Sequence, residues 1–196
     1  MSLPARQSTS LVDRVLDGAD RCCQKWGINK VTVDDIASEA GVSRATIYRL
    51  FPGGKDVLFE ALRVRELEDF FAVLRADVEG ADSAEEVLVR NVVAATRELR
   101  ADDHLALRLA SEPGEVLGEL TVEGLPRIIR FATAFVAPLA EPHLDPAAAR
   151  AVVDVLTRLT ISYFLAPSDT VDLADEASAR ALVRPLLRPY LDSVTP

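Results

Sequence analysis

The sequence predicts an all-α protein of about nine helices, and three observations support this fold class. Apolar residues recur at steps of three and four along most of the chain, which is the period of a helix with one buried face. Capping residues precede these stretches, and glycine or proline follows them. No stretch shows the sustained alternation with β-branched residues that is typical of a strand.

Four helices are expected in the first part of the chain. The first three each follow a serine or threonine, whose side chain can accept a hydrogen bond from a free backbone amide. Ser10 and Thr32 are each followed three residues later by aspartate, which is the spacing of a capping box. The four expected helices span residues 11–26, 33–40, 44–50 and 56–78.

Five more helices are expected in the remainder, separated by Pro, Gly and Asp at their ends. They span residues 84–100, 103–111, 123–139, 145–166 and 173–191. Pro185 and Pro189 are expected to kink or fray the last of them, because proline lacks the amide hydrogen that a helix interior needs.

Composition excludes several classes of protein. The 196 residues carry 22 basic and 31 acidic side chains, and 49% of them are hydrophobic, which is ordinary for a globular chain. The longest stretches without a charged residue, 131–140 and 159–168, are half of the about 20 residues that a membrane span needs. Residues 1–10 lack an apolar signal core, so we expect a cytoplasmic protein without a membrane partner.

The sequence offers no pattern for catalysis or metal binding. Cys22 and Cys23 are adjacent, where a disulfide would close no useful loop, and we expect them to be buried thiols of a helix. His104 and His143 are the only histidines, too few for a metal set. Gly53-Gly54-Lys55 lacks the spacing of a phosphate-binding loop. We therefore expect no catalytic residue, no metal site and no cofactor.

The charge is unevenly distributed. The formal net charge of −9 argues against a protein that coats nucleic acid through bulk positive charge. Residues 1–55, however, have a net charge of +2, and residues 56–196 have a net charge of −11. Such asymmetry indicates a nucleic-acid or membrane contact on the less acidic part, but it needs a motif to support it.

Residues 32–55 supply that motif. Two short helices, each with its own N-cap, are joined by a tight turn at Gly41-Val42, and glycine can adopt positive φ there without penalty. This is a helix-turn-helix, whose second helix places its first residues in the major groove of DNA.

The exposed residues of the second helix suit DNA. Arg44 can donate two hydrogen bonds to a guanine edge, Thr46 can bond bases or phosphate, and Ala45 can contact a thymine methyl. Others can reach the phosphate backbone, including the hydroxyl and amides at the start of helix 33–40. The predicted DNA-contacting residues are Thr32, Ser43, Arg44, Ala45, Thr46, Tyr48, Arg49 and Lys55.

Residues 10–62 resemble the DNA-binding region of the TetR (tetracycline-repressor) family of bacterial transcriptional regulators. The shared features are T-V-D-D-I-A at 32–37, A-G-V-S at 40–43 and T-I-Y-R-L-F-P at 46–52. Family members usually continue with a Pro-Ser-Lys-Glu-like turn, whereas this sequence has Pro52-Gly53-Gly54-Lys55-Asp56, which is one residue longer. The resemblance implies a DNA-binding domain at residues 1–55 and a helical domain at 56–196 that binds a small effector and forms a homodimer.

Apolar stripes on the last two expected helices are candidates for the dimer interface, although either stripe could serve only the subunit's own core. The candidate dimer residues are Val152, Leu156, Leu159, Tyr163, Leu182, Leu186 and Tyr190. Apolar and polar residues between 56 and 139 are candidates for the wall of an effector pocket. These are Phe70, Phe71, Leu74, Asn91, His104, Leu107, Arg108, Phe131 and Phe135.

The sequence thus predicts a regulator, not an enzyme, that represses by binding a palindromic operator as a homodimer and is released by a small molecule. Two alternatives remain, a helical enzyme with a small-molecule pocket and a helical interaction module with no DNA role.

Overall fold

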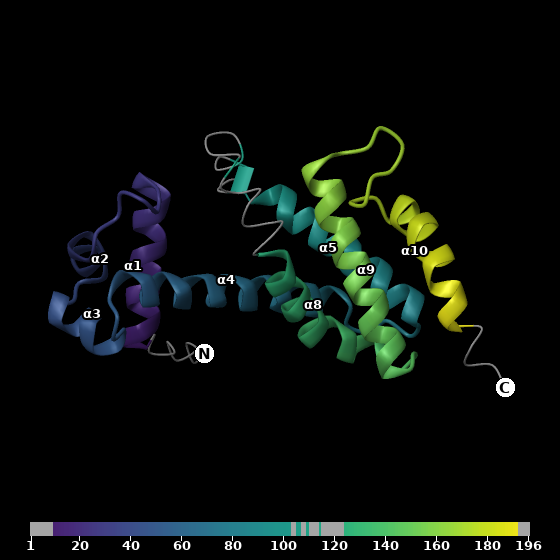
Figure 1. Cartoon of the computed structure of the whole chain (residues 1–196), viewed down its shortest axis with the longest axis horizontal. Helices are drawn as coiled ribbons and strands as arrows, with labels where there is room; N and C mark the ends of the chain where they lie inside the picture. The colour runs from purple at the N-terminus through teal and green to yellow at the C-terminus, as the bar shows by residue number, and fades with distance from the viewer. Residues whose placement is uncertain (1–9, 103–104, 107–108, 110–113, 115–123, 192–196) are drawn as a thin grey trace, which may run out of the picture. The chain divides into compact units, whose positions relative to one another are not determined.

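The computed structural model describes residues 10–102, 105–106, 109, 114 and 124–191 (Figure 1). Within these residues the chain forms eight continuous α-helices and no strand, which confirms the all-α prediction. Most of the helix expected at 103–111 lies outside the described residues. The chain divides into two compact units, residues 1–67 and 68–196, so the division falls past residue 55, the boundary expected from the sequence.

The first unit is built from one helix of ordinary length, two short helices and the start of a long one. These are α1 (Leu11–Trp26), α2 (Val33–Ala40), α3 (Arg44–Leu50) and α4 (Lys55–Asp77). The expected capping boxes at Ser10 and Thr32 are both formed. Gly41 ends α2 in the left-handed conformation at φ 65°, where its amide donates to the carbonyls of Ala37 and Ser38.

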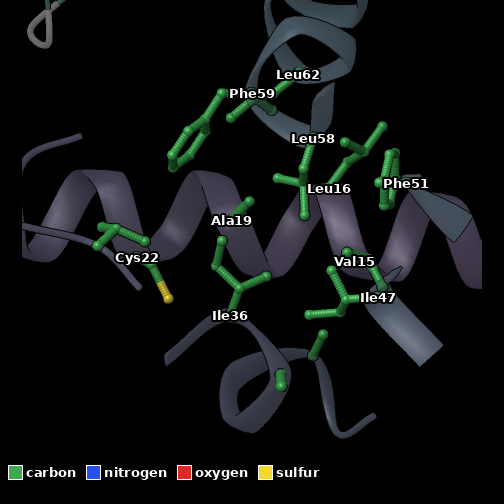
Figure 2. Packing of buried hydrophobic residues seen from close by; sticks show 13 residues of the cluster. Val15, Leu16, Ala19, Cys22, Ile36, Ile47, Phe51, Leu58, Phe59 and Leu62 are labelled. Atoms are coloured by element: carbon green, nitrogen blue, oxygen red, sulfur yellow. The ribbon is translucent and has the colours of Figure 1, made fainter. Parts of the chain in front are cut away.

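The core of the first unit lies around α1. Figure 2 shows Ile36 of α2, Ile47 of α3 and Leu58 of α4 directed toward the same helix, where they surround Val15 and Ala19. All five side chains are fully buried. Complete burial of an aliphatic side chain of this size contributes roughly 1.5–3 kcal/mol, so this core holds α2, α3 and the first turns of α4 on α1.

Close contact between α1 and α2 depends on a glycine inside α1. A Cβ atom at Gly18 would lie 3.0 Å from the Cβ of Ala40 and 3.1 Å from its backbone nitrogen. Arg14, one turn earlier on α1, donates from Nη2 to the carbonyl oxygen of Ala40 at 3.0 Å. The end of α2 is therefore held against α1 by both packing and a hydrogen bond.

The second unit contains the rest of α4 with α5 (Ala84–Ala101), α8 (Leu125–Ala140), α9 (Pro146–Leu165) and α10 (Glu176–Leu191). Helix α5 contacts α8, α9 and α10, and α8 packs along α9. The last helix was expected to begin near Leu173, and this is wrong because the carboxylate of Asp175 accepts from the amide of Ser178 and starts the helix later. Helix α10 continues through Pro185 and Pro189.

Two further expectations concern single features. Cys22 is buried and Cys23 is half-buried, and burial raises the pKa of the Cys23 thiol to about 11. A thiol with this pKa is protonated at neutral pH and is a poor nucleophile. In the part of the chain that the structure describes, no helix is both long and apolar enough to cross a membrane.

Candidate nucleic-acid interface

Helices α2 and α3 form the predicted helix-turn-helix. Ser43 caps α3, and its hydroxyl oxygen accepts from the amide of Thr46 at 3.1 Å. The hydroxyls of Ser43 and Thr46 also lie within hydrogen-bond distance of each other, at 2.9 Å. The first turn of α3 is therefore fixed by its own side chains.

Helix α3 has one buried and one exposed face. Ile47 is fully buried and attaches the helix to α1, whereas Thr46 is half-buried beside it. Arg44, Ala45, Tyr48 and Arg49 are exposed. Tyr48 is 44% exposed, so its ring is open to a partner. The exposed face therefore carries the donors and the flat ring that a nucleic acid can contact.

Arg44 already has two partners on this surface. Its Nη1 donates to the carboxylate of Asp34 at 3.2 Å, and its Nη2 lies 3.5 Å from the hydroxyl of Tyr48. The guanidinium also lies over the Tyr48 ring, 5.6 Å from its centroid. The bond to Tyr48 and the charge of Asp34 raise the pKa of Arg44, so this side chain stays cationic.

The longer turn after α3 is built from two glycines with positive φ, Gly53 at 117° and Gly54 at 71°. A Cβ at Gly54 would lie 2.9 Å from a ring carbon of Tyr48, so the glycine lets the ring rest on the turn. Lys55 begins α4, with its Nζ 5.3 Å from the centroid of Phe59. The turn therefore supports Tyr48 and places Lys55 at the next helix start.

Several basic residues of the first unit are held by internal partners. Arg21 and Lys25 both bind the carboxylate of Glu39, at 2.7 and 2.9 Å, and Arg14 binds the end of α2. Lys30 and Arg49 have no ion pair among the described residues. The hydroxyl of Thr32 is bonded to Asp35 within the cap of α2. Fewer cations are therefore available to a partner than the number of basic residues in this unit suggests.

The structure brings four of the predicted effector residues together. The ring centroid of Phe71 lies 5.3 Å from that of Phe70, edge to face, and 5.4 Å from that of Phe135, in a stacked arrangement. The ring centroids of Phe131 and Phe135 lie 6.2 Å apart. Leu74 is buried one turn after Phe70 and Phe71 on α4. His104, Leu107 and Arg108 lie outside the described residues.

Asn91 is the predicted polar residue that the structure describes on α5. Its side-chain nitrogen is buried and has no hydrogen-bond partner within the described part of the chain. A buried amide without a partner is uncommon, because desolvation without a hydrogen bond costs about 1–3 kcal/mol.

A separate hollow of about 410 Å³ lies along α8 and the start of α9. Arg130 and Arg150 line it together with Glu141, whose carboxylate lies 4.0 Å from Arg150. None of the predicted effector residues lines this hollow.

The predicted dimer residues divide into two groups. Val152 and Leu156 are buried, at 2% and 4% exposure, in the core of the second unit itself. The others are half-buried, namely Leu159, Tyr163, Leu182, Leu186 and Tyr190. On α10 the residues that face the core are instead Ala179, Val183 and Leu187, which are fully buried.

No group of three or more metal-ligating side chains occurs among the residues that the structure describes. His143 is half-buried in the turn between α8 and α9.

Comparisons with known proteins place these observations in a family. Residues 15–62 match the family described as bacterial regulatory proteins, tetR family. A regulator of Mycobacterium bovis, described as an uncharacterized HTH-type transcriptional regulator, is 36% identical over 104 residues, which cover 53% of this chain and 52% of the relative. In this match the chain spans about half the length of the relative. A second such regulator, from Mycobacterium tuberculosis strain H37Rv, is 31% identical over 199 residues, covering 96% of this chain and 89% of the relative.

Solved structures share the fold at lower identity. The TetR family repressor AlkX from Dietzia, which is implicated in biodegradation of n-alkanes, superposes with a TM-score of 0.66 at 24% identity over 94% of this chain and 97% of that one. A regulator from Streptomyces coelicolor superposes with a TM-score of 0.59 at 21% identity over 90% and 97%. Identities of this size show the fold alone. The family is shown by the match at residues 15–62 and by the relative that aligns over nearly the whole chain. The chain belongs to the TetR family of bacterial helix-turn-helix transcriptional regulators.

Proposed function

We propose that the protein is a repressor that binds a palindromic operator as a homodimer and releases it when a small molecule binds the second unit. The observation that carries the proposal is the exposed face of α3, where Arg44, Tyr48 and Arg49 follow a capped turn on a helix anchored by Ile47. A short helix of this kind reads a few base pairs in the major groove.

The exposed residues divide into two roles. Arg44 donates to a guanine edge, and Ala45 and Thr46 lie beside it for contact with neighbouring bases. Tyr48, Arg49 and Lys55, with the hydroxyl of Ser43, bind phosphates and fix the register of the helix on the duplex. At the start of α2 the phosphate contact falls to the free backbone amides after Thr32, because the Thr32 hydroxyl donates to Asp35. The site of action is the cytoplasm, where chromosomal DNA lies in bacteria.

Two-fold symmetry extends the recognition site. One helix reads too few base pairs for a unique operator, whereas two helices read half-sites about 34–36 Å apart. The residues that support a dimer surface are those that one chain leaves partly exposed on α9 and α10, each run spaced by four residues along one helical face. We assign to this surface Val155, Leu159, Tyr163, Leu182, Leu186 and Tyr190.

The effector is an apolar molecule that carries a hydrogen-bond acceptor. The joined rings of Phe70, Phe71, Phe131 and Phe135 support the apolar part, and Phe135 is 38% exposed. The amide of Asn91 supports the acceptor, because such a group would satisfy its buried nitrogen. Helix α4 contributes residues to both units and carries the change in the second unit toward the recognition helix.

The proposal is tested by selecting bound fragments from genomic DNA with the wild-type protein and then measuring their affinity by fluorescence anisotropy. We expect the double variant Arg44→Ala, Tyr48→Ala to bind the selected operator at least tenfold more weakly, because a lost bidentate base contact alone costs about 1–3 kcal/mol. Sedimentation should show the same dimer for both proteins.

The controls separate the alternatives. Leu182→Glu with Leu186→Glu should give monomers with weak operator binding while each monomer remains helical. An interaction module or an enzyme would instead enrich no DNA fragment at all. If the Arg44, Tyr48 double variant protects the same DNA as the wild type, α3 is not the reading helix.

A further inference from the structure

Asp34 is an acidic residue on the surface that the proposed function presents to DNA. It lies in the first turn of α2, 68% of its side chain is exposed, and its carboxylate accepts from Nη1 of Arg44 on α3. A carboxylate here opposes binding to every DNA sequence, because it repels the phosphates. The position of Asp34 therefore needs an explanation other than affinity.

The hydrogen-bonding capacity of arginine supplies one. A guanidinium has five N–H donors in one plane, and a bidentate contact with guanine uses two of them on one edge. Nη1 of Arg44 donates to the Asp34 carboxylate and lies 3.2 and 3.5 Å from its two oxygens. The opposite edge, formed by Nε and Nη2, then carries the donors for a base, and Nη2 has only the long contact of 3.5 Å with Tyr48.

The contact with Asp34 also lowers the conformational entropy that Arg44 loses on binding DNA. A free arginine side chain loses rotamer freedom when it is held in one geometry, and this loss opposes binding. Asp34 on one side and the Tyr48 ring on the other restrict Arg44 before DNA is bound. Part of this loss then occurs in folding and not in recognition.

We propose that Asp34 is a specificity-determining positioning residue, which stays paired with Arg44 on DNA and directs its Nε and Nη2 edge to a guanine. The inference rests on the proposed function, since it assumes that α3 reads DNA. On non-specific DNA there is no guanine edge in register, and the carboxylate only weakens binding. Asp34 therefore increases the ratio of operator affinity to non-specific affinity.

The test measures that ratio in Asp34→Asn, using the selected operator, the operator with the guanine pair contacted by Arg44 replaced, and unrelated DNA of equal length. We expect non-specific binding to tighten and the ratio to fall by about three- to twentyfold, because an exposed ion pair contributes up to about fivefold at each of two half-sites. Preference for guanine at the contacted pair should fall with it.

A double-mutant cycle separates positioning from simple charge. In the Arg44→Ala background, Asp34→Asn should tighten binding to both DNAs equally and leave the ratio unchanged. Asp56→Asn removes the same charge from the first turn of α4, has no ion pair within the described residues, and should also leave the ratio unchanged. Fluorescence of Trp26, the only tryptophan, reports whether each variant is folded.

The outcomes are distinguishable. A wild-type protein that discriminates its operator and an Asp34→Asn variant with the same ratio would overturn the role of Asp34 alone. The same loss of ratio in the Arg44→Ala background would also overturn it, because the effect would not pass through Arg44. A wild-type protein that discriminates no operator would overturn the proposed function as well.

Discussion

Gly18 is the residue on which the close packing of α1 against α2 depends. Ala40, the last residue of α2, lies against it, and a Cβ atom at Gly18 would lie 3.1 Å from the backbone nitrogen and 3.2 Å from the Cα of Ala40. Backbone cannot rotate away as a long side chain can. A side chain at Gly18 must therefore push α2 away from α1. This shift would weaken the hydrogen bond of Arg14 to α2 and expose the buried Ala37.

We expect Gly18→Val to destabilise the protein by about 1–3 kcal/mol, the usual cost of an overpacked core. The gain in helix propensity over glycine is less than about 1 kcal/mol and does not offset it. Urea unfolding followed by Trp26 fluorescence measures the change.

Ser38→Val is the matched control, because it adds a similar side chain on the exposed face of α2. This variant should stay within about 0.5 kcal/mol of the wild type. If Gly18→Val is as stable as the control, the close contact between α1 and α2 is not a constraint on the fold.

At the scale of elements, Glu39 connects α2 to α1 through two cations. Hydrogen bonds from Lys25 and then Arg21 hold the pKa of its carboxyl below the ordinary value of 4.5. The unfolded chain regains the ordinary value and so binds more protons between the two pKa values. The stabilisation from this contact is therefore present above about pH 4.5 and is lost as the pH falls through the folded pKa.

We expect the urea midpoint to fall more steeply below pH 4.5 in the wild type than in Glu39→Gln, which has no carboxyl to protonate. Asp13 and Asp35, whose pKa values are also lowered by their cap hydrogen bonds, continue to give the variant some acid sensitivity. Glu68→Gln, at an exposed position of α4, should follow the wild-type curve. Parallel curves for the wild type and Glu39→Gln would contradict the link between α1 and α2.

Element ends were predictable where a local chemical signal exists. Ser10, Thr32 and Ser43 cap helices as expected, because a cap depends on residues three positions apart. The expected start of α10 near Leu173 is too early, since Leu173 has the apolar character of a helix face but is buried from a loop. The sequence does not reveal the role of Gly18, because a glycine inside a helix can be explained only when the residue that packs against it is known.

The candidate site was predictable in part for the same reason. The exposure of Arg44, Tyr48 and Arg49 follows from their helical spacing around Ile47. This spacing can be read directly from the sequence. The pairing of Arg44 with Asp34 depends on the angle between two helices, and the assignment of α10 faces depends on which neighbour covers Val183 and Leu187. Tertiary packing decides both, and no local pattern encodes it.

At the scale of the whole molecule, the charge distribution bears on how DNA is approached. The chain has a net charge of −9, and residues 56–196 account for −11. Internal ion pairs occupy Arg21 and Lys25, so under the proposed function the phosphate contacts fall to a small number of cations, Arg49 among them. Binding therefore depends on individual residues more than it does in a strongly basic protein.

Salt dependence measures this directly. Each phosphate contact lowers the slope of log K against log salt concentration by about 0.9, through release of bound counterions. In the proposed dimer Arg49→Gln would remove one phosphate contact from each protomer, so we expect the slope to become shallower by about 2 and the affinity for all sequences to fall together. Arg75→Gln removes an exposed charge from the second unit and should leave the slope unchanged. A change of about 1 would indicate that a single protomer contacts the duplex through Arg49, and no change would remove Arg49 from the interface.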